Sequence, residues 1–183
     1  QTCALPICLS LSDFVKPCGT DYVGAFAVTA GRGIEEIISG YQQTDDFKAL
    51  LYQSLSDRLA EAAAELLHAR VRREVWGYAP DERIDCQRAL RAQYRGIRPA
   101  AGYPSLPDQS AIFAIEKIVG FANVGIAVTP NGAMSPASSV SGLMIAHPAS
   151  RYFMIGAIAP DQRRDYAARR GITEEELSKW LPK

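Results

Sequence analysis

The sequence has few of the side chains on which self-contained hydrolytic or metal-dependent catalysis depends. Its 183 residues include two histidines, His68 and His147, and four cysteines. No two cysteines are spaced as Cys-x-x-Cys and no histidine lies close to one in the sequence, so a zinc site is not predicted. We expect the cysteines to be free or buried thiols. With so little imidazole, a nucleophile–histidine pair is also disfavoured, and the residues present do not predict a self-sufficient hydrolase.

The chain also lacks an excess of charge of either sign and a long apolar run. Twenty basic residues balance twenty acidic residues, which gives a formal net charge of +0. This balance provides no electrostatic basis for binding nucleic acid or an anionic membrane. No apolar run reaches the roughly 18–20 residues that span a bilayer, and the N-terminus has no signal-peptide pattern. We therefore expect a cytoplasmic protein with neither nucleic acid nor membrane among its partners.

Length, composition and hydrophobic patterning predict one domain that contains a long helix. A chain of this length, with 48% hydrophobic and 22% charged residues, can bury one sizeable core. Apolar residues recur near the helical period over 45–75, and Thr44, Asp45 and Asp46 can cap this helix and complement its dipole. Shorter helices are predicted over 81–94, 110–119 and 161–170, with one more after Gly31-Arg32-Gly33 and one that begins at Thr173.

Runs of β-branched and aromatic residues predict the strands. The first, over 21–30, is short enough to be a buried central strand. Three more are predicted over 124–129, 138–146 and 152–159, with good turn sequences between them. Tight connections allow antiparallel pairing but not parallel pairing. The predicted fold class is therefore α+β, a single domain whose twisted, mainly antiparallel sheet is flanked by helices, one of them long and central.

The stretch 94–108 has the least regular pattern in the chain. It reads Tyr-Arg-Gly-Ile-Arg-Pro-Ala-Ala-Gly-Tyr-Pro-Ser-Leu-Pro-Asp, and its three prolines exclude a continuous helix. Arg98 provides a guanidinium that can bind a carboxylate through two hydrogen bonds, and Tyr103 provides an aromatic ring. This make-up suits a small-molecule clamp. The alternative is a proline-rich connector between two helices, in which both side chains only cover its flanks.

Several motifs, in this order along the chain, resemble a known family. They are Asp-Tyr-Val-Gly-Ala-Phe-Ala-Val-Thr at 21–29, Asp-Arg-Leu-Ala-Glu-Ala at 57–62, Trp-Gly-Tyr-Ala-Pro at 76–80, Arg-Gly-Ile-Arg-Pro-Ala-Ala-Gly-Tyr-Pro at 95–104, Ser-Val-Ser-Gly at 139–142 and His-Pro at 147–148. Together they resemble the activation domain of cobalamin-dependent methionine synthase, the C-terminal module that binds S-adenosylmethionine.

The resemblance implies that residues 1–183 form one domain, the activation domain. The sequence similarity to the family runs from about Leu11 to the C-terminus. Residues 1–8 match no part of the family, and we expect them to be foreign or disordered. The family domain begins earlier, with a segment that supplies an acidic contact to the amine of the ligand. The resemblance therefore implies that the N-terminal part of the family domain is missing from this sequence.

The resemblance places the ligand on the 94–108 stretch. Arg98 would hold the carboxylate of S-adenosylmethionine, with the fixed φ of Pro99 limiting its freedom. Ala100 and Gly102 would keep side chains away, so that backbone groups can contact the ligand. Tyr103 would present its ring to the sulfonium or the adenine, an interaction worth about 0.5–2 kcal/mol.

Three further ligand residues are implied outside this stretch. Glu61 would accept hydrogen bonds from the ammonium group, and Tyr152 with Phe153 would border the nucleoside. Without the resemblance, Glu61 is an ordinary residue at the edge of the apolar stripe of its helix or a buried acceptor facing the clamp. A Tyr-Phe pair at the start of a strand is more often part of a core than a ligand wall.

The implied reaction is the reductive methylation of cob(II)alamin, which regenerates methylcobalamin. Methyl transfer from a sulfonium needs no general base, so no catalytic residue is expected and the chain would act by proximity and orientation. In the family, another domain holds the cobalamin, a flavodoxin-type partner donates the electron, and zinc belongs only to the full-length enzyme. We expect the isolated chain, part of a methyltransferase, to bind ligand without turnover. The alternatives are a free-standing adapter that reactivates a separate cobalamin protein, and a structural domain that has lost the site.

Overall fold

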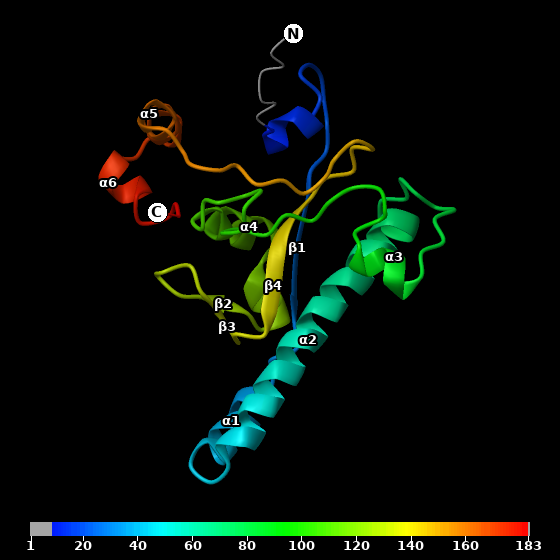
Figure 1. The fold of residues 1–183 in the computed structure, drawn as a ribbon, viewed down its shortest axis with the longest axis vertical. Helices are drawn as coiled ribbons and strands as arrows, with labels where there is room; N and C mark the ends of the chain where they lie inside the picture. Colours follow the sequence, from blue (N-terminus) through cyan, green and yellow to red (C-terminus); the bar gives the residue numbers. More distant parts are fainter. Residues whose placement is uncertain (1–8, 183) are drawn as a thin grey trace, which may run out of the picture.

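A long helix and a two-stranded antiparallel sheet organise the fold of the computed structural model, which describes residues 9–182. The strands are β1 (Gly24–Thr29) and β4 (Ser139–Met144), and their register pairs Gly24 with Met144 and Thr29 with Ser139 (Figure 1). Residues 1–8, which we expected to be foreign or disordered, lie outside the described part. The mixed architecture confirms the predicted α+β class with one long helix.

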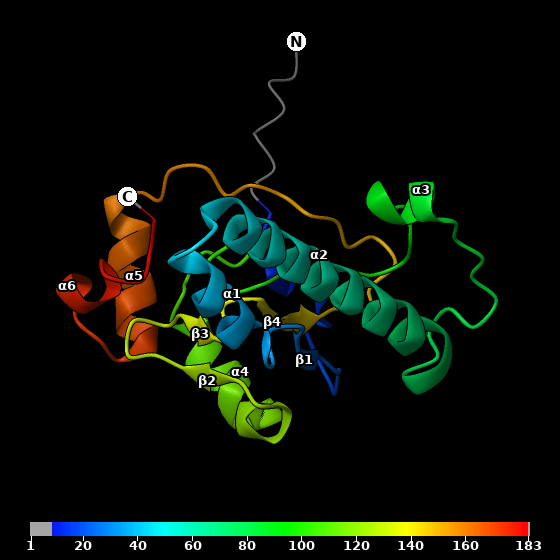
Figure 2. The same cartoon turned by 90° about the horizontal axis from the view of Figure 1, so that it is seen from below.

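The helix α2 (Asp46–Arg70) covers one face of this sheet and α4 (Ala111–Val119) covers the other (Figure 2). The alternation of strand side chains explains this arrangement. Phe26 of β1 packs in a cluster with Ala64 of α2, whereas its neighbours Ala25 and Ala27 pack against the cluster that includes Ile112 of α4. Strand β1 is therefore covered on both faces, although Phe26 is its one buried residue. Among residues 9–182 it pairs with β4 alone, so the prediction of a central strand is wrong.

The predicted helix over 45–75 is present, but its last turn has a different geometry. Asp45 caps α2 by accepting a hydrogen bond from the backbone N–H of Lys48 at 3.0 Å. After α2 the chain continues as a π-helical turn, η2 (Val71–Val75), which ends before Gly77 in a left-handed conformation. Before α2, the helix α1 (Ile34–Gln42) follows the Gly31–Gly33 stretch as expected and lies beside the first half of α2.

The prediction of a helix over 81–94 is wrong in extent. Only α3 (Cys86–Leu90) forms, capped by the side chain of Asp85. None of its residues is buried and Leu90 is 88% exposed, so the weak apolar pattern finds no surface to pack on. Ala92 then adopts a positive φ of 51°, which stops the helix.

The prediction of one sheet that contains all four strands is also wrong. In the 124–129 run, Val124 ends a 3-10 turn, η3 (Phe121–Val124), and only β2 (Ala127–Val128) forms a strand. It pairs only with β3 (Met134–Ser135) in a separate hairpin. The 152–159 run forms no strand at all. The ladder position beside β4 is taken instead by the 97–99 segment, where Ile97 and Ile145 exchange backbone hydrogen bonds of 3.0 and 2.9 Å.

The C-terminal helices α5 (Pro160–Arg170) and α6 (Glu174–Leu177) form as predicted, the second capped by Thr173. They form their own small cluster around Ala167, Leu177 and Leu181 at one side of the molecule (Figure 2). Among residues 9–182, no helix is both long enough and apolar enough to cross a membrane.

Candidate functional site

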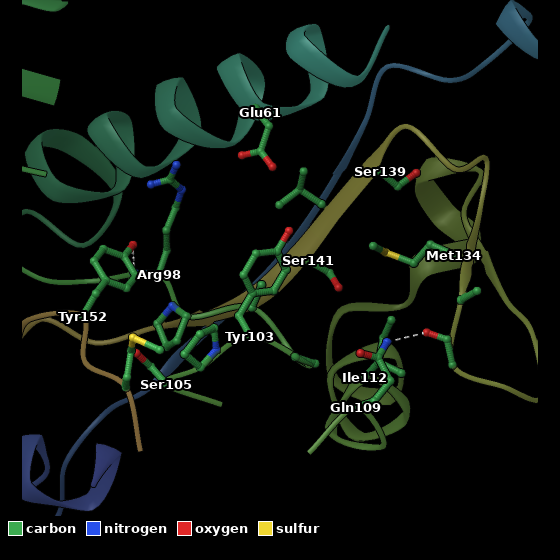
Figure 3. Close-up of a pocket in the computed structure, with 18 of the residues that line it drawn as sticks. Glu61, Arg98, Tyr103, Ser105, Gln109, Ile112, Met134, Ser139, Ser141 and Tyr152 are labelled. Atoms are coloured by element: carbon green, nitrogen blue, oxygen red, sulfur yellow. Dashed lines mark hydrogen bonds between the residues drawn. The ribbon is translucent and has the colours of Figure 1, made fainter. Parts of the chain in front are cut away.

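The 94–108 loop, α2 and β4 surround a cavity of about 550 Å³. The start of the 152–154 segment and the β2–β3 hairpin complete its walls (Figure 3). This volume lies within the range typical of small-molecule sites, about 300–1,000 Å³. The lining residues from the loop are Arg98, Pro99, Ala100, Ala101, Tyr103, Pro104 and Ser105.

The loop is fixed to the rest of the fold by backbone contacts. The carbonyl of Pro99 accepts a hydrogen bond of 2.9 Å from the N–H of Leu143 on β4. The hydroxyl of Ser105 donates to the carbonyl of Phe153 at 2.8 Å and accepts from the Phe153 N–H at 3.1 Å. The loop is therefore an ordered wall of the cavity rather than a loose connector.

Arg98 is held in place by one ion pair and two hydrogen bonds. Its Nη2 lies 2.9 Å from Oε2 of Glu65, and its Nη1 donates to the Tyr94 hydroxyl at 3.0 Å. Its backbone N–H donates to the Tyr152 hydroxyl at 3.0 Å (Figure 3). Burial by itself lowers the pKa of Arg98, but the nearby oxygens of Tyr94 and Glu65 favour the charged form and leave the pKa raised. The guanidinium, 16% exposed, is therefore a fixed positive charge at the cavity wall.

The predicted ligand residues gather at this cavity. Glu61 projects from α2 toward it (Figure 3) and is exposed rather than buried. Tyr103 and Tyr152, 60% and 44% exposed, present accessible rings to it. Of the seven residues predicted for the ligand, those that line the cavity are Glu61, Arg98, Ala100, Tyr103, Tyr152 and Phe153.

Gly102, the seventh, shapes the loop instead of lining the cavity. Its φ is +84°, its N–H donates to the carbonyl of Leu106 at 2.8 Å, and a Cβ added to it would lie 2.0 Å from Oε1 of Gln109. The positive φ favours glycine here, whereas the neighbouring Gln109 amide is the end of a flexible side chain that could move aside. Whether its backbone contacts a ligand stays a prediction.

Sequence reasoning missed two residues that define the charged end of the cavity, Glu65 and Tyr94. Glu65 follows Glu61 by four residues on α2, so both carboxylates lie on the same face of the helix. This spacing could have identified Glu65. Tyr94 precedes Arg98 by four residues but lies outside any helix, so the sequence carried no signal for their contact.

Arg72 and His68 form a buried cluster around the Tyr94 ring. The Arg72 guanidinium, 2% exposed, lies 4.1 Å from the centre of the Tyr94 ring and bonds Glu82 through its Nε at 2.6 Å. His68 meets the same ring edge-on at 5.2 Å. Burial, followed by the charges of Arg72 and Arg98, lowers the pKa of His68 to about 3, so this imidazole is neutral near pH 7.

A second cavity, of about 820 Å³, lies on the other side of Arg98, between α2 and the residues around α3. Glu61, Arg98 and Tyr152 line both cavities and therefore stand between them. Within residues 9–182, no group of three or more His, Cys, Asp or Glu side chains could hold a metal ion. Cys18 and Cys86 are free and exposed, as expected of unpaired thiols, whereas Cys3 and Cys8 lie outside the described residues.

The cavity brings together a fixed cation, a carboxylate and aromatic walls, which is the make-up of a binding site for a small zwitterionic molecule with a flat ring. Residues 4–171 match the family described as "Vitamin B12 dependent methionine synthase, activation domain". The chain belongs to this family.

A solved structure supports the same assignment. The chain is similar to a crystal structure of the MetH reactivation domain bound to AdoHcy, with a TM-score of 0.84 and 41% sequence identity. The similarity covers 87% of this chain and 50% of that chain. The chain therefore spans about half the length of the solved protein it matches, and it shares its fold.

Proposed function

We propose that this chain is the S-adenosylmethionine-binding activation module of a cobalamin-dependent methionine synthase. Its role there is to support the reductive methylation of cob(II)alamin, which regenerates methylcobalamin. The observation that carries the proposal is the charged Arg98 guanidinium, held at the wall of a cavity that Glu61 also enters. Family membership and the AdoHcy bound by the similar reactivation domain agree with a nucleoside-linked amino acid as the ligand.

The lining residues suit each part of S-adenosylmethionine. The free N–H groups of the Arg98 guanidinium match a carboxylate, and the Glu61 carboxylate matches an ammonium group. Tyr103, Tyr152 and Phe153 provide aromatic surface for the adenosyl group and the sulfonium. The small side chain of Ala100 leaves the loop backbone accessible to the ligand.

In this role the chain binds and orients. S-adenosylmethionine, when bound, supplies a methyl group on its sulfonium. The leaving group is the neutral thioether, so methyl transfer needs no general base. The site contributes no nucleophile, and its fixed guanidinium and carboxylate would hold the amino-acid end so that the methyl group is presented outward. The proposal also includes the cobalamin-binding domain as docking partner, a flavodoxin-type protein as electron donor and the cytoplasm as the location. Zinc belongs to the full-length methyltransferase and not to this chain.

Calorimetric titration with S-adenosylmethionine tests the proposal. The parent chain should bind the ligand, and Arg98→Ala should weaken binding at least about tenfold, since hydrogen bonds to charged groups contribute about 1.5–3 kcal/mol. Arg169→Ala, which removes an arginine that is 70% exposed on α5, is the matched control and should bind like the parent. Circular dichroism verifies that each variant is folded. A folded parent that does not bind, or an Arg98→Ala variant that binds equally well, would contradict the proposal.

A further inference from the structure

The Arg98 guanidinium is only partly used by the protein. A guanidinium has five N–H donors. Within residues 9–182, Nη2 forms an ion pair with Glu65 and Nη1 donates a hydrogen bond to the Tyr94 hydroxyl, whereas Nε has no protein partner. These two contacts fix the position of the Arg98 guanidinium and leave some of its N–H groups free to donate to a ligand.

Glu65 offers a rigid support for one side of this fork. It stands in the C-terminal part of α2, next to Ala64, which is fully buried. Its side chain is 28% exposed, and its second oxygen, Oε1, is buried without a hydrogen-bond partner among the described residues. Within residues 9–182, Arg98 is therefore the one side chain that pairs with this carboxylate.

Tyr94 supports the other side. Its ring contacts the Arg72 guanidinium on one face and His68 edge-on, and its hydroxyl accepts the hydrogen bond from Arg98 at 3.0 Å. Burial raises the pKa of Tyr94 well above its ordinary value, so it stays a neutral phenol. A neutral acceptor holds the guanidinium without cancelling the charge that a ligand carboxylate needs.

We propose that Glu65 and Tyr94 are positioning residues, which hold the Arg98 guanidinium in place before the ligand arrives and thereby set the affinity for the carboxylate of the ligand. This inference rests on the proposed function. When binding has to order a long side chain, the affinity is lower by about two- to twelvefold. A guanidinium that is ordered before binding avoids this loss. The opposite arrangement, in which Glu65 competes with the ligand for the guanidinium, predicts the opposite effect of removing its charge.

Two ligands of equal net charge separate these outcomes. S-adenosylhomocysteine carries the amino-acid end, whereas 5′-methylthioadenosine has the same nucleoside and a thioether without it. Glu65→Gln should weaken binding of S-adenosylhomocysteine about fivefold and change binding of methylthioadenosine less than about twofold. Tyr94→Phe, which keeps the ring for Arg72, should act in the same direction. Glu74→Gln, which removes a 56% exposed carboxylate paired with Arg70, is the matched control and should change neither affinity.

Unchanged or tighter binding of S-adenosylhomocysteine by Glu65→Gln would overturn the proposal, and so would an equal loss for both ligands. A second readout needs no ligand. Nuclear magnetic resonance should show slow rotation of the Arg98 guanidinium in the parent and faster rotation in Glu65→Gln, and equal rotation in both would also overturn it. The parent could fail to bind S-adenosylhomocysteine and still show slow Arg98 rotation that becomes faster in Glu65→Gln. In that case the proposed function is wrong, whereas Glu65 still holds the guanidinium in place.

Discussion

Gly142 of β4 lies directly against the carbonyl group of Pro99. A Cβ added at Gly142 would be 2.4 Å from the Pro99 oxygen and 3.0 Å from the Cα of Ala100. Both contacts are to backbone, so no side chain can rotate out of the way. The 94–108 loop therefore approaches the sheet as closely as it does because residue 142 has no side chain.

Gly142→Ala should displace the loop and weaken ligand binding. Overpacking of this kind costs about 1–3 kcal/mol, which urea-induced unfolding would measure, and S-adenosylhomocysteine titration would report the shift of Arg98. Gly40→Ala, at a helical position in α1 where a Cβ meets no atom within 4 Å, is the control. It should be neutral or stabilising by up to about 1 kcal/mol. Parent-like stability and affinity in Gly142→Ala would contradict the assignment of this contact.

Asp108, the last residue of the 94–108 loop, should be a major determinant of stability. It is 2% exposed and accepts hydrogen bonds from the Ser110 N–H and hydroxyl, the Tyr166 hydroxyl at 2.7 Å and the Arg170 guanidinium. Asp108→Ala leaves these donors unpaired and should lower the free energy of unfolding by about 3–5 kcal/mol.

The matched control for Asp108 is Asp165→Ala. Asp165 pairs with Arg169 at 2.7 Å on the surface of α5, where both side chains are at least 65% exposed. Exposed pairs contribute about 0–1 kcal/mol, so this variant should unfold almost like the parent in urea. Similar losses in the two variants would show that the buried network does not tie the loop to the C-terminal helices.

Stability should fall in acid partly because of His68. Its pKa is lowered to about 3 in the folded state, against about 6.5 when unfolded, so below pH 6.5 the unfolded chain binds a proton that the native chain does not. Stability is therefore lost as the pH decreases from about 6.5 toward 3, by at most about 1.4 kcal/mol per pH unit. Urea-induced unfolding at pH 7, 6 and 5 would measure this slope.

His68→Gln should flatten this slope, whereas His147→Gln, which changes an exposed histidine, should leave it unchanged. Carboxylates that titrate in the same pH range contribute equally to the slope of the parent and of both variants. The difference in slope between the parent and His68→Gln therefore measures the contribution of the His68 imidazole. Equal slopes for the parent and His68→Gln would mean that His68 titrates normally in the folded protein.

Ser105 should hold the 152–154 segment at the cavity. Ser105→Ala removes both hydrogen bonds to the backbone of Phe153 and should cost about 1–3 kcal/mol because those groups lose their partner. We expect weaker binding of methylthioadenosine as well, since Tyr152 and Phe153 are proposed to border the nucleoside. Retained affinity for this ligand would argue that the aromatic pair plays no part in binding.

The sequence predicted local features better than the pairing of distant segments. The period of α2 and a cap among Thr44, Asp45 and Asp46 are local features, and both were predicted; the capping residue is Asp45. The 152–159 run has strand composition, yet the ladder position beside β4 is occupied by Ile97 and Pro99, which no local pattern indicates. The helix over 81–94 failed for a related reason, because a weak apolar stripe depends on a packing surface that α3 does not have.

The candidate site shows the same division. Arg98 and Tyr103 were apparent from the loop itself, and Glu61, Tyr152 and Phe153 came from the family resemblance. Glu65 could have been found from its helical spacing to Glu61, but its contact with Arg98 depends on how the loop crosses α2. Motifs therefore located the cavity, and only the fold revealed what holds its central charge.

The most direct test of the account is a crystal structure of the chain with S-adenosylhomocysteine. The account predicts the ligand in the cavity between the 94–108 loop and β4, with its carboxylate bonded to the Arg98 guanidinium and its nucleoside beside Tyr152 and Phe153. Arg98 should still contact Glu65 and Tyr94. A ligand in the cavity next to α3, or one whose carboxylate does not touch Arg98, would contradict it.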